Sequence, residues 1–233
     1  MKKSSAKLLV AIMAILVLSA VGAVAVASAI DNISSTSSYA FTSSTVPQNV
    51  SMQFSTPQPL TGVPPVGSWV IIGNHPTNTQ FYINLNGAPV GAYQAVQNAL
   101  NTWDTVIPGM FKPLIVDNTT SGGQLDGKDV ISWGSCVNGA TAQTYLWPGT
   151  QERDIVFSTA TQWSVAPNVT YHSYDVQNIA THELGHIIGL GDIYREDFNY
   201  VTMFGYAPKG ETSKDVLSPA DIYGAQQIYG VAA

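Results

Sequence analysis

Eleven residues, from His182 to Asp192, limit the possible folds of this chain more than any other feature. They begin with His-Glu-Leu-Gly-His. On an α-helix, residues i and i+4 lie one turn apart on the same face, so His182 and His186 can reach one zinc ion together. Glu183 lies about 100° further round the helix, where its carboxylate can take a proton from a metal-bound water. The run therefore predicts a metal-binding helix. On a helical wheel, the two histidines lie at the edge of its buried face, where a cleft could open.

A third ligand is needed, because a catalytic zinc ion keeps three protein ligands and one open position. Residue 192 cannot reach back while the helix continues, but Gly189 can adopt the positive φ that ends it. Asp192 then offers an oxygen ligand. Two alternatives stay open: Asp192 is a solvated loop acid, or Glu196 or Glu211 is the ligand. We expect the remaining histidines, His75 and His172, in loops or at the surface.

The first 29 residues are typical of a targeting segment. Lys2, Lys3 and Lys7 precede a nearly uninterrupted apolar run at 8–27, and 27–29 offers the small residues of a cleavage site. This pattern predicts a secretory signal peptide. The alternative is an uncleaved anchor, because about 20 apolar residues can span a bilayer. In either case the rest of the chain is expected to be secreted or tethered to the outer face of the membrane.

Residues 30–65 form the next segment. Thirteen of the 32 residues from 31 to 62 are Ser or Thr, and only Asp31 among them is charged. Such a sequence buries little apolar surface. We interpret it as a flexible linker or a short propeptide.

The remaining residues, 66–233, predict one α/β (α+β) domain. A strand is expected at 80–85 and an amphipathic helix at 92–106, followed by short β-type runs at 113–116, 130–133, 141–147 and 154–157. A second helix is expected from Asp175, as N-cap, to Gly189. A third begins at Ser218, with Pro219 and Asp221 in its first turn and a buried stripe of Ile222, Ala225 and Ile228.

Charge and cysteine content exclude three classes of protein. The chain has 9 Lys and Arg against 15 Asp and Glu, a net charge of −6, so we expect no nucleic-acid partner. The single cysteine, Cys136, excludes an intrachain disulfide framework and a Cys-rich zinc finger.

Three stretches resemble a known family. His182–Leu190 resembles the zinc helix of the metzincin metallopeptidases, and of the matrixins in particular. Residues 202–205 resemble the methionine-containing turn beneath the zinc, with Met203 as its structural methionine, and 217–230 resembles the matrixin C-terminal helix. The resemblance covers about residues 66–233. Asp192 stands where most metzincins have a third histidine, a variant similar to the snapalysins.

The resemblance implies a twisted five-stranded mixed sheet with three helices and a zinc cleft below an antiparallel edge strand at 141–147. A polypeptide substrate would pair with that strand by β-augmentation. The cysteine motif of matrixin propeptides is absent. Residues 117–150 contain no histidine, so a second, structural zinc ion is not supported. Four acidic residues could serve as calcium ligands: Asp126, Asp129, Glu152 and Asp154. The alternative is that they form a solvated acidic face.

These features predict a secreted zinc endopeptidase that hydrolyses peptide bonds by a zinc-bound water activated by Glu183. We expect a monomer that meets a membrane only if the N-terminal segment stays uncleaved. The alternative is a non-catalytic secreted or cell-surface glycoprotein with a degenerate metallopeptidase domain.

Overall fold

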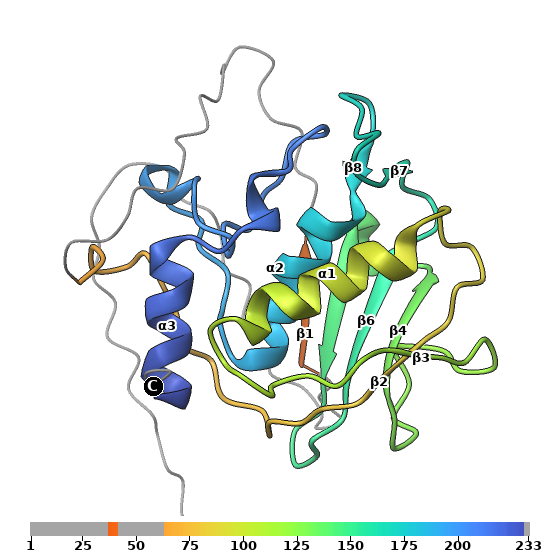
Figure 1. The fold of residues 1–233 in the computed structure, drawn as a ribbon, viewed down its shortest axis with the longest axis horizontal. Coiled ribbons are helices and arrows are strands. Elements are labelled where there is room, and N and C mark those ends of the chain that lie inside the picture. Colours follow the sequence, from red (N-terminus) through yellow and green to blue (C-terminus); the bar gives the residue numbers. More distant parts are fainter. Residues whose placement is uncertain (1–36, 42–62, 231–233) are drawn as a thin grey trace, which may run out of the picture. The chain divides into compact units, whose positions relative to one another are not determined.

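A computed structural model describes residues 37–41 and 63–230 (Figure 1). The predicted signal peptide or anchor at 1–29 lies outside the described residues. Among the residues that are described, no helix is long and apolar enough to cross a membrane.

One mixed sheet forms the centre of the domain, in the strand order β1-β5-β6-β4-β2-β3. The strands are β1 (Ser37–Phe41), β2 (Phe81–Ile83), β3 (Ile115–Val116), β4 (Asp129–Gly134), β5 (Ala142–Leu146) and β6 (Arg153–Ser158). Strands β3, β2, β4 and β6 are parallel, and β5 is antiparallel to β6. These five strands confirm the predicted mixed sheet.

The sixth strand, β1, differs from expectation. It comes from the segment interpreted as a linker or propeptide, and it pairs antiparallel with β5. The strand predicted at 141–147 is therefore antiparallel, as expected, but it is not the outermost strand of the described sheet.

Three helices accompany the sheet: α1 (Ala92–Asp104), α2 (Val176–Ile188) and α3 (Pro219–Tyr229). Helices α1 and α2 lie together over one face of the sheet (Figure 1). Trp103 of α1 is fully buried and donates its indole N–H to the Thr181 carbonyl of α2 at 2.8 Å. Short elements absent from the sequence prediction complete the fold: a two-stranded sheet of β7 (Trp163–Ser164) and β8 (Tyr174–Asp175), and 3-10 turns η1 (Val137–Gly139), η2 (Glu196–Phe198) and η3 (Ser213–Asp215).

Helix α2 begins and ends where its sequence predicts. The Asp175 carboxylate accepts the Asn178 N–H, and Gly189 ends the helix with φ of 104°. Twelve of its thirteen residues are buried. The wheel-based expectation that His182 and His186 lie at the edge of a buried face is therefore wrong, because packing encloses the helix on nearly every side.

Helix α3 carries the predicted capping box of Ser218 and Asp221, with Pro219 in its first turn. Its buried residues are Ala220, Asp221, Gly224 and Ala225. The predicted stripe is thus only partly correct: Ala225 is buried, whereas Ile222 and Ile228 are half-buried at the rim of the core.

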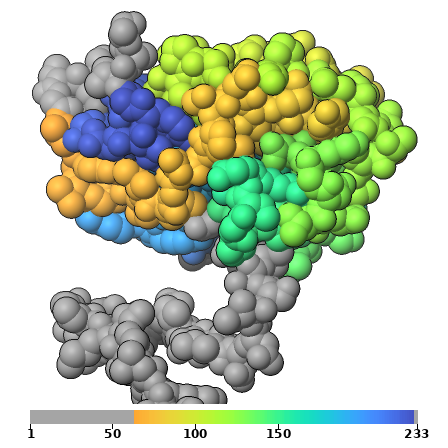
Figure 2. Space-filling view, turned by 90° about the horizontal axis from the view of Figure 1, so that it is seen from below, coloured from red at the N-terminus to blue at the C-terminus, as the bar shows by residue number. Residues whose placement is uncertain are grey.

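The segment that starts at residue 63 lies against α3 in the space-filling view (orange against blue, Figure 2). Trp69 packs edge-on against Tyr223 at 4.9 Å, and the Tyr229 hydroxyl donates to the His75 carbonyl. His75 is 4% exposed, and its Nε2 lies 2.6 Å from the Gln151 carbonyl. His75 thus lies in a loop, as expected, but it is buried there rather than exposed at the surface.

Candidate metal centre

Helix α2 and the turn after it bring three possible ligands together. His182 Nε2 lies 3.2 Å from Asp192 Oδ1, and His186 Nε2 lies 3.5 Å from the same oxygen. A tetrahedral zinc ion with bonds of about 2.0–2.1 Å separates neighbouring ligand atoms by about 3.3–3.4 Å. The observed separations match those of a zinc ligand set. Among the described residues, this is the only group of three or more metal-ligating side chains whose atoms lie close enough to share an ion.

Backbone carbonyls fix how both imidazoles face the site. His182 Nδ1 lies 2.8 Å from the Thr202 carbonyl oxygen, and His186 Nδ1 lies 2.9 Å from that of Leu190. Because a carbonyl oxygen only accepts, each Nδ1 carries the ring proton, and each Nε2 presents a lone pair towards Asp192. Facing lone pairs of nitrogen and carboxylate oxygen repel one another unless a cation lies between them. The donor set therefore fits a divalent metal ion.

Burial and the contacts among the three groups shift their pKa values. It lowers the pKa of His182 to about 4, and it lowers the pKa of His186 as well. Burial alone would raise the pKa of Asp192, but its contacts with the two histidines outweigh this effect and lower that pKa to about 2. Near neutral pH the site thus holds two neutral imidazoles and one carboxylate, the protonation states that metal binding requires.

The turn that delivers Asp192 is held by a distant part of the chain. Ile72 donates its N–H to the Gly189 carbonyl at 2.8 Å, and Gly191 donates to the Val70 carbonyl at 2.9 Å. A Cβ added to Gly189 would lie 2.2 Å from the Gly73 carbonyl oxygen. Glycine is required there both by the positive φ and by this close approach.

Glu183 is fully buried, and its two carboxylate oxygens have different surroundings. Oε2 accepts the hydroxyl of Thr144, on β5, at 2.5 Å, whereas Oε1 accepts no hydrogen bond from the described residues. Burial raises the pKa of Glu183 to about 8, against the lowering effect of the Thr144 donor. The Thr144 hydroxyl thus holds Oε2 in place, whereas Oε1 is available to accept a proton from a molecule outside the chain.

Met203 lies directly beneath the ligand helix. It is 1% exposed, and a Cβ added to Gly185, between the two histidines, would lie 2.2 Å from its sulfur. Asp221 accepts the backbone N–H groups of Thr202 and Met203 at 2.8 and 3.2 Å. The N-terminal cap of α3 therefore also fixes the methionine turn.

Sequence reasoning missed three supporting residues: Thr144, Asp221 in its second role, and Tyr194. The Tyr194 hydroxyl donates to Asp192 Oδ2 at 2.9 Å, leaving Oδ1 towards the histidines. A buried strand position occupied by a polar residue was an available signal for Thr144, because a buried hydroxyl needs a partner. No comparable signal marks Tyr194.

The alternative third ligands lie elsewhere. Glu196 is exposed, and Glu211 is buried but accepts the Ser213 hydroxyl at 2.6 Å. Neither belongs to the group of converging ligands. His172 is exposed, as expected.

The acids considered for calcium accept backbone N–H groups. Glu152 binds the N–H groups of Asp126 and Gly127, and Asp154 binds those of Gly123, Gln124 and Val130. Asp129 accepts the Arg153 N–H at 2.7 Å. Glu152 and Asp154 thereby stabilise the loop before β4, so the structure does not support a calcium site there.

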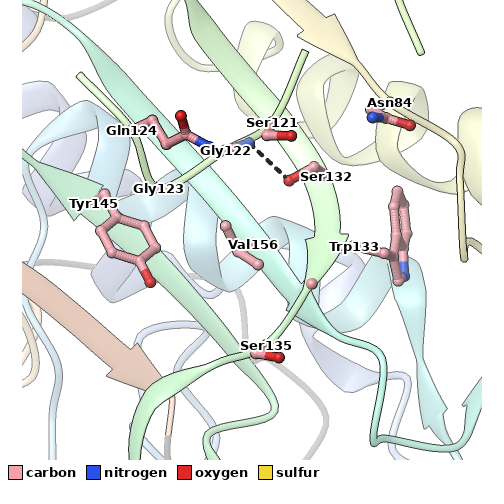
Figure 3. A pocket seen from close by; sticks show the side chains of 11 residues that line it. Asn84, Ser121, Gly122, Gly123, Gln124, Ser132, Trp133, Ser135, Tyr145 and Val156 are labelled. Carbon is pink, nitrogen blue, oxygen red and sulfur yellow. Dashed lines mark hydrogen bonds between the residues drawn. The ribbon is translucent and has the colours of Figure 1, made fainter. Parts of the chain in front are cut away.

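A polar pocket of about 300 Å³ lies beside the same loop (Figure 3). Its lining includes Tyr145 and Ser132, whose hydroxyl accepts the Gly122 N–H at 3.0 Å. None of the candidate site residues lines it.

Comparisons with known proteins give two matches. The family model of the matrixins, peptidase family M10, matches residues 85–230. Among solved structures, metalloproteinase-II from Bacteroides fragilis is similar, with 13% sequence identity and a TM-score of 0.40; the match covers 70% of this chain and 58% of that protein. No curated protein sequence matches the chain. Because the family model covers more than half of the chain, the protein belongs to the matrixins, a family of zinc metallopeptidases.

Proposed function

We propose that this matrixin is a secreted zinc endopeptidase in which Glu183 is the general base. The observation that carries the proposal is the convergence of His182, His186 and Asp192 on one point, next to a buried glutamate with one unengaged oxygen. His182, His186 and Asp192 would hold the zinc ion. A bound zinc ion would polarise the peptide carbonyl and lower the pKa of a water molecule.

The chain's own residues supply the proton transfers. Glu183 Oε1 is available to accept the proton of the attacking water and to deliver it to the leaving amine. Thr144 holds the other carboxylate oxygen, so the side chain cannot rotate freely between these steps. Tyr194 keeps Asp192 Oδ1 directed towards the histidines, and Met203 packs below without taking part in the chemistry.

The direct test is hydrolysis of casein by the purified protein, with and without 1,10-phenanthroline. Cleavage that the chelator abolishes and added zinc restores is the expected result. Glu183→Gln should retain zinc and lose cleavage. A zinc-loaded wild-type protein that cleaves no polypeptide would instead support the alternative, a non-catalytic surface glycoprotein.

Export is part of the proposal and rests on the N-terminal sequence. A positively charged start, an apolar run and small residues at 27–29 support cleavage near Ala29. N-terminal sequencing of the protein from culture medium should then begin near residue 30. Recovery only in the membrane fraction, with Met1 retained, would indicate an anchor.

A further inference from the structure

Lys214, in η3, is the only buried Lys or Arg among the described residues. Burying a lysine is unfavourable unless its amino group is hydrogen-bonded. Its backbone N–H donates to the side-chain oxygen of Asn178 at 2.8 Å. Asn178 lies on α2, four residues before His182 and thus on the same face of the helix. The backbone of this buried lysine is therefore attached to the helix that carries two of the proposed ligands.

The side chain of Lys214 holds the backbone that follows Met203. Its Nζ donates to the Phe204 carbonyl at 2.6 Å and to the Tyr206 carbonyl at 3.0 Å. Burial lowers the pKa of Lys214, and four carboxylates act in the opposite direction: Glu211, Asp192, Asp221 and Glu183. Two of these carboxylates, those of Asp192 and Glu183, belong to the candidate site. Lys214 is thus linked to the site both by hydrogen bonds to the backbone and by charge.

The ring of Tyr194 rests on the segment that Lys214 holds. A Cβ added to Gly205 would overlap the Tyr194 ring, so the ring covers this glycine directly. The Tyr206 ring packs edge-on against the Tyr194 ring, with 5.3 Å between the centroids. The Tyr194 hydroxyl in turn donates to Asp192 Oδ2. The position of residues 204–206 therefore determines where Tyr194 holds the proposed third ligand.

The backbone joins the same two segments. Ile193, the residue after Asp192, donates its N–H to the Met203 carbonyl at 2.8 Å. Its own carbonyl accepts the Gly205 N–H at 2.9 Å. The segment that carries Asp192 is thus paired with the segment whose carbonyls bind Lys214.

We propose that Lys214 is a positioning residue of the zinc site. It holds the Phe204 and Tyr206 carbonyls, these fix the surface on which Tyr194 rests, and Tyr194 holds Asp192. The inference rests on the proposed function, because it concerns a ligand of the same site. Groups that orient a metal ligand in this indirect way typically change metal affinity about 10- to 100-fold when they are removed.

The main test is a double-mutant cycle on zinc affinity, measured by competition with a chelator of known affinity. Lys214→Met keeps an unbranched side chain but removes the donor, and Tyr194→Phe removes only the hydroxyl. Each variant should bind zinc about 10- to 100-fold more weakly than wild type. The double variant should be at most about threefold weaker than the weaker single variant, because both residues act along one path. Independent effects would instead multiply, to about 100-fold or more.

Two controls separate this role from a general loss of stability. Phe81→Leu, in the core on β2, should lower the free energy of unfolding and leave zinc affinity unchanged. Lys128→Met removes a partly exposed lysine that pairs with Asp117, and it should also leave zinc affinity unchanged. If Lys214→Met does not fold, Lys214→Gln takes its place, because its side chain is one atom shorter and cannot reach both carbonyls.

A second measurement needs neither zinc nor catalysis. In the metal-free protein, amide hydrogen exchange at Ile193 and Gly205 reports the pairing of the two segments. Lys214→Met should accelerate exchange at both amides, whereas Lys128→Met should not.

Wild-type zinc affinity in a folded Lys214 variant, or a double variant whose losses multiply, would overturn the inference. Unchanged exchange at Ile193 and Gly205 would overturn it as well. A protein that binds zinc but cleaves no polypeptide would contradict the proposed function alone. The two failures are therefore distinguishable.

Discussion

The hydrogen bond between Thr144 and Glu183 makes a quantitative prediction. Thr144 is fully buried, and its hydroxyl lies 2.5 Å from Glu183 Oε2. Thr144→Val keeps the shape and the strand preference of the side chain but removes the donor. A hydrogen bond to a charged group contributes about 1.5–3 kcal/mol. If that bond holds the base in place, kcat should fall about 10- to 150-fold.

The assay is steady-state cleavage of a fluorogenic peptide, together with zinc analysis and thermal unfolding. KM and zinc content should stay near wild type, because Thr144 contacts no proposed ligand. Thr144→Ser retains the hydroxyl and should keep most of the activity. Losing the donor also raises the pKa of Glu183, so the acidic limb of the kcat profile should move to higher pH.

The reasoning would be refuted if Thr144→Val had the kcat of wild type. It would equally be refuted if Thr144→Ser were as defective as Thr144→Val, since packing rather than the hydroxyl would then explain the loss.

Two other predictions follow from backbone geometry and buried charge. Gly189→Ala should lower the free energy of unfolding by about 2 kcal/mol or more and weaken zinc binding, because its Cβ would meet the Gly73 carbonyl at 2.2 Å. Gly149→Ala is the control for backbone strain alone, because Gly149 has a positive φ but no atoms close to an added Cβ. Equal zinc affinities of the Gly189→Ala and Gly149→Ala variants would contradict the expectation. Burial and the adjacent Asp175 raise the pKa of Asp215 to about 8, against about 3.9 in an unfolded chain. The native state holds the extra proton between these values, so stability should fall as pH rises from 4 to 8. Asp215→Asn should reduce the difference between the free energies of unfolding measured with urea at pH 5 and pH 8. A difference as large as that of wild type would contradict the assignment of this pH dependence to Asp215.

Local sequence patterns predicted the parts of the site that depend on helix geometry. The spacing of His182 and His186, and a glycine that can end the helix at 189, are properties of one short segment. The caps at Asp175 and Ser218 were equally local. These features needed no knowledge of the rest of the chain.

Most features that sequence reasoning missed depend on contacts between distant segments. Nothing in residues 37–41 specifies that they pair with residues more than 100 positions later. The burial of α2 on nearly every side depends on several elements, including the turn around Met203 and the strand that carries Thr144. The turn that carries Asp192 is held by residues 70–72.

The central claim is that His182, His186 and Asp192 share one zinc ion. Zinc-edge X-ray absorption on the purified protein tests it most directly. The account predicts one zinc per chain, bound by two imidazole nitrogens and oxygen ligands at about 2.0–2.2 Å, with occupancy lost in Asp192→Ala. A zinc ion with sulfur coordination, or full occupancy in Asp192→Ala, would contradict it.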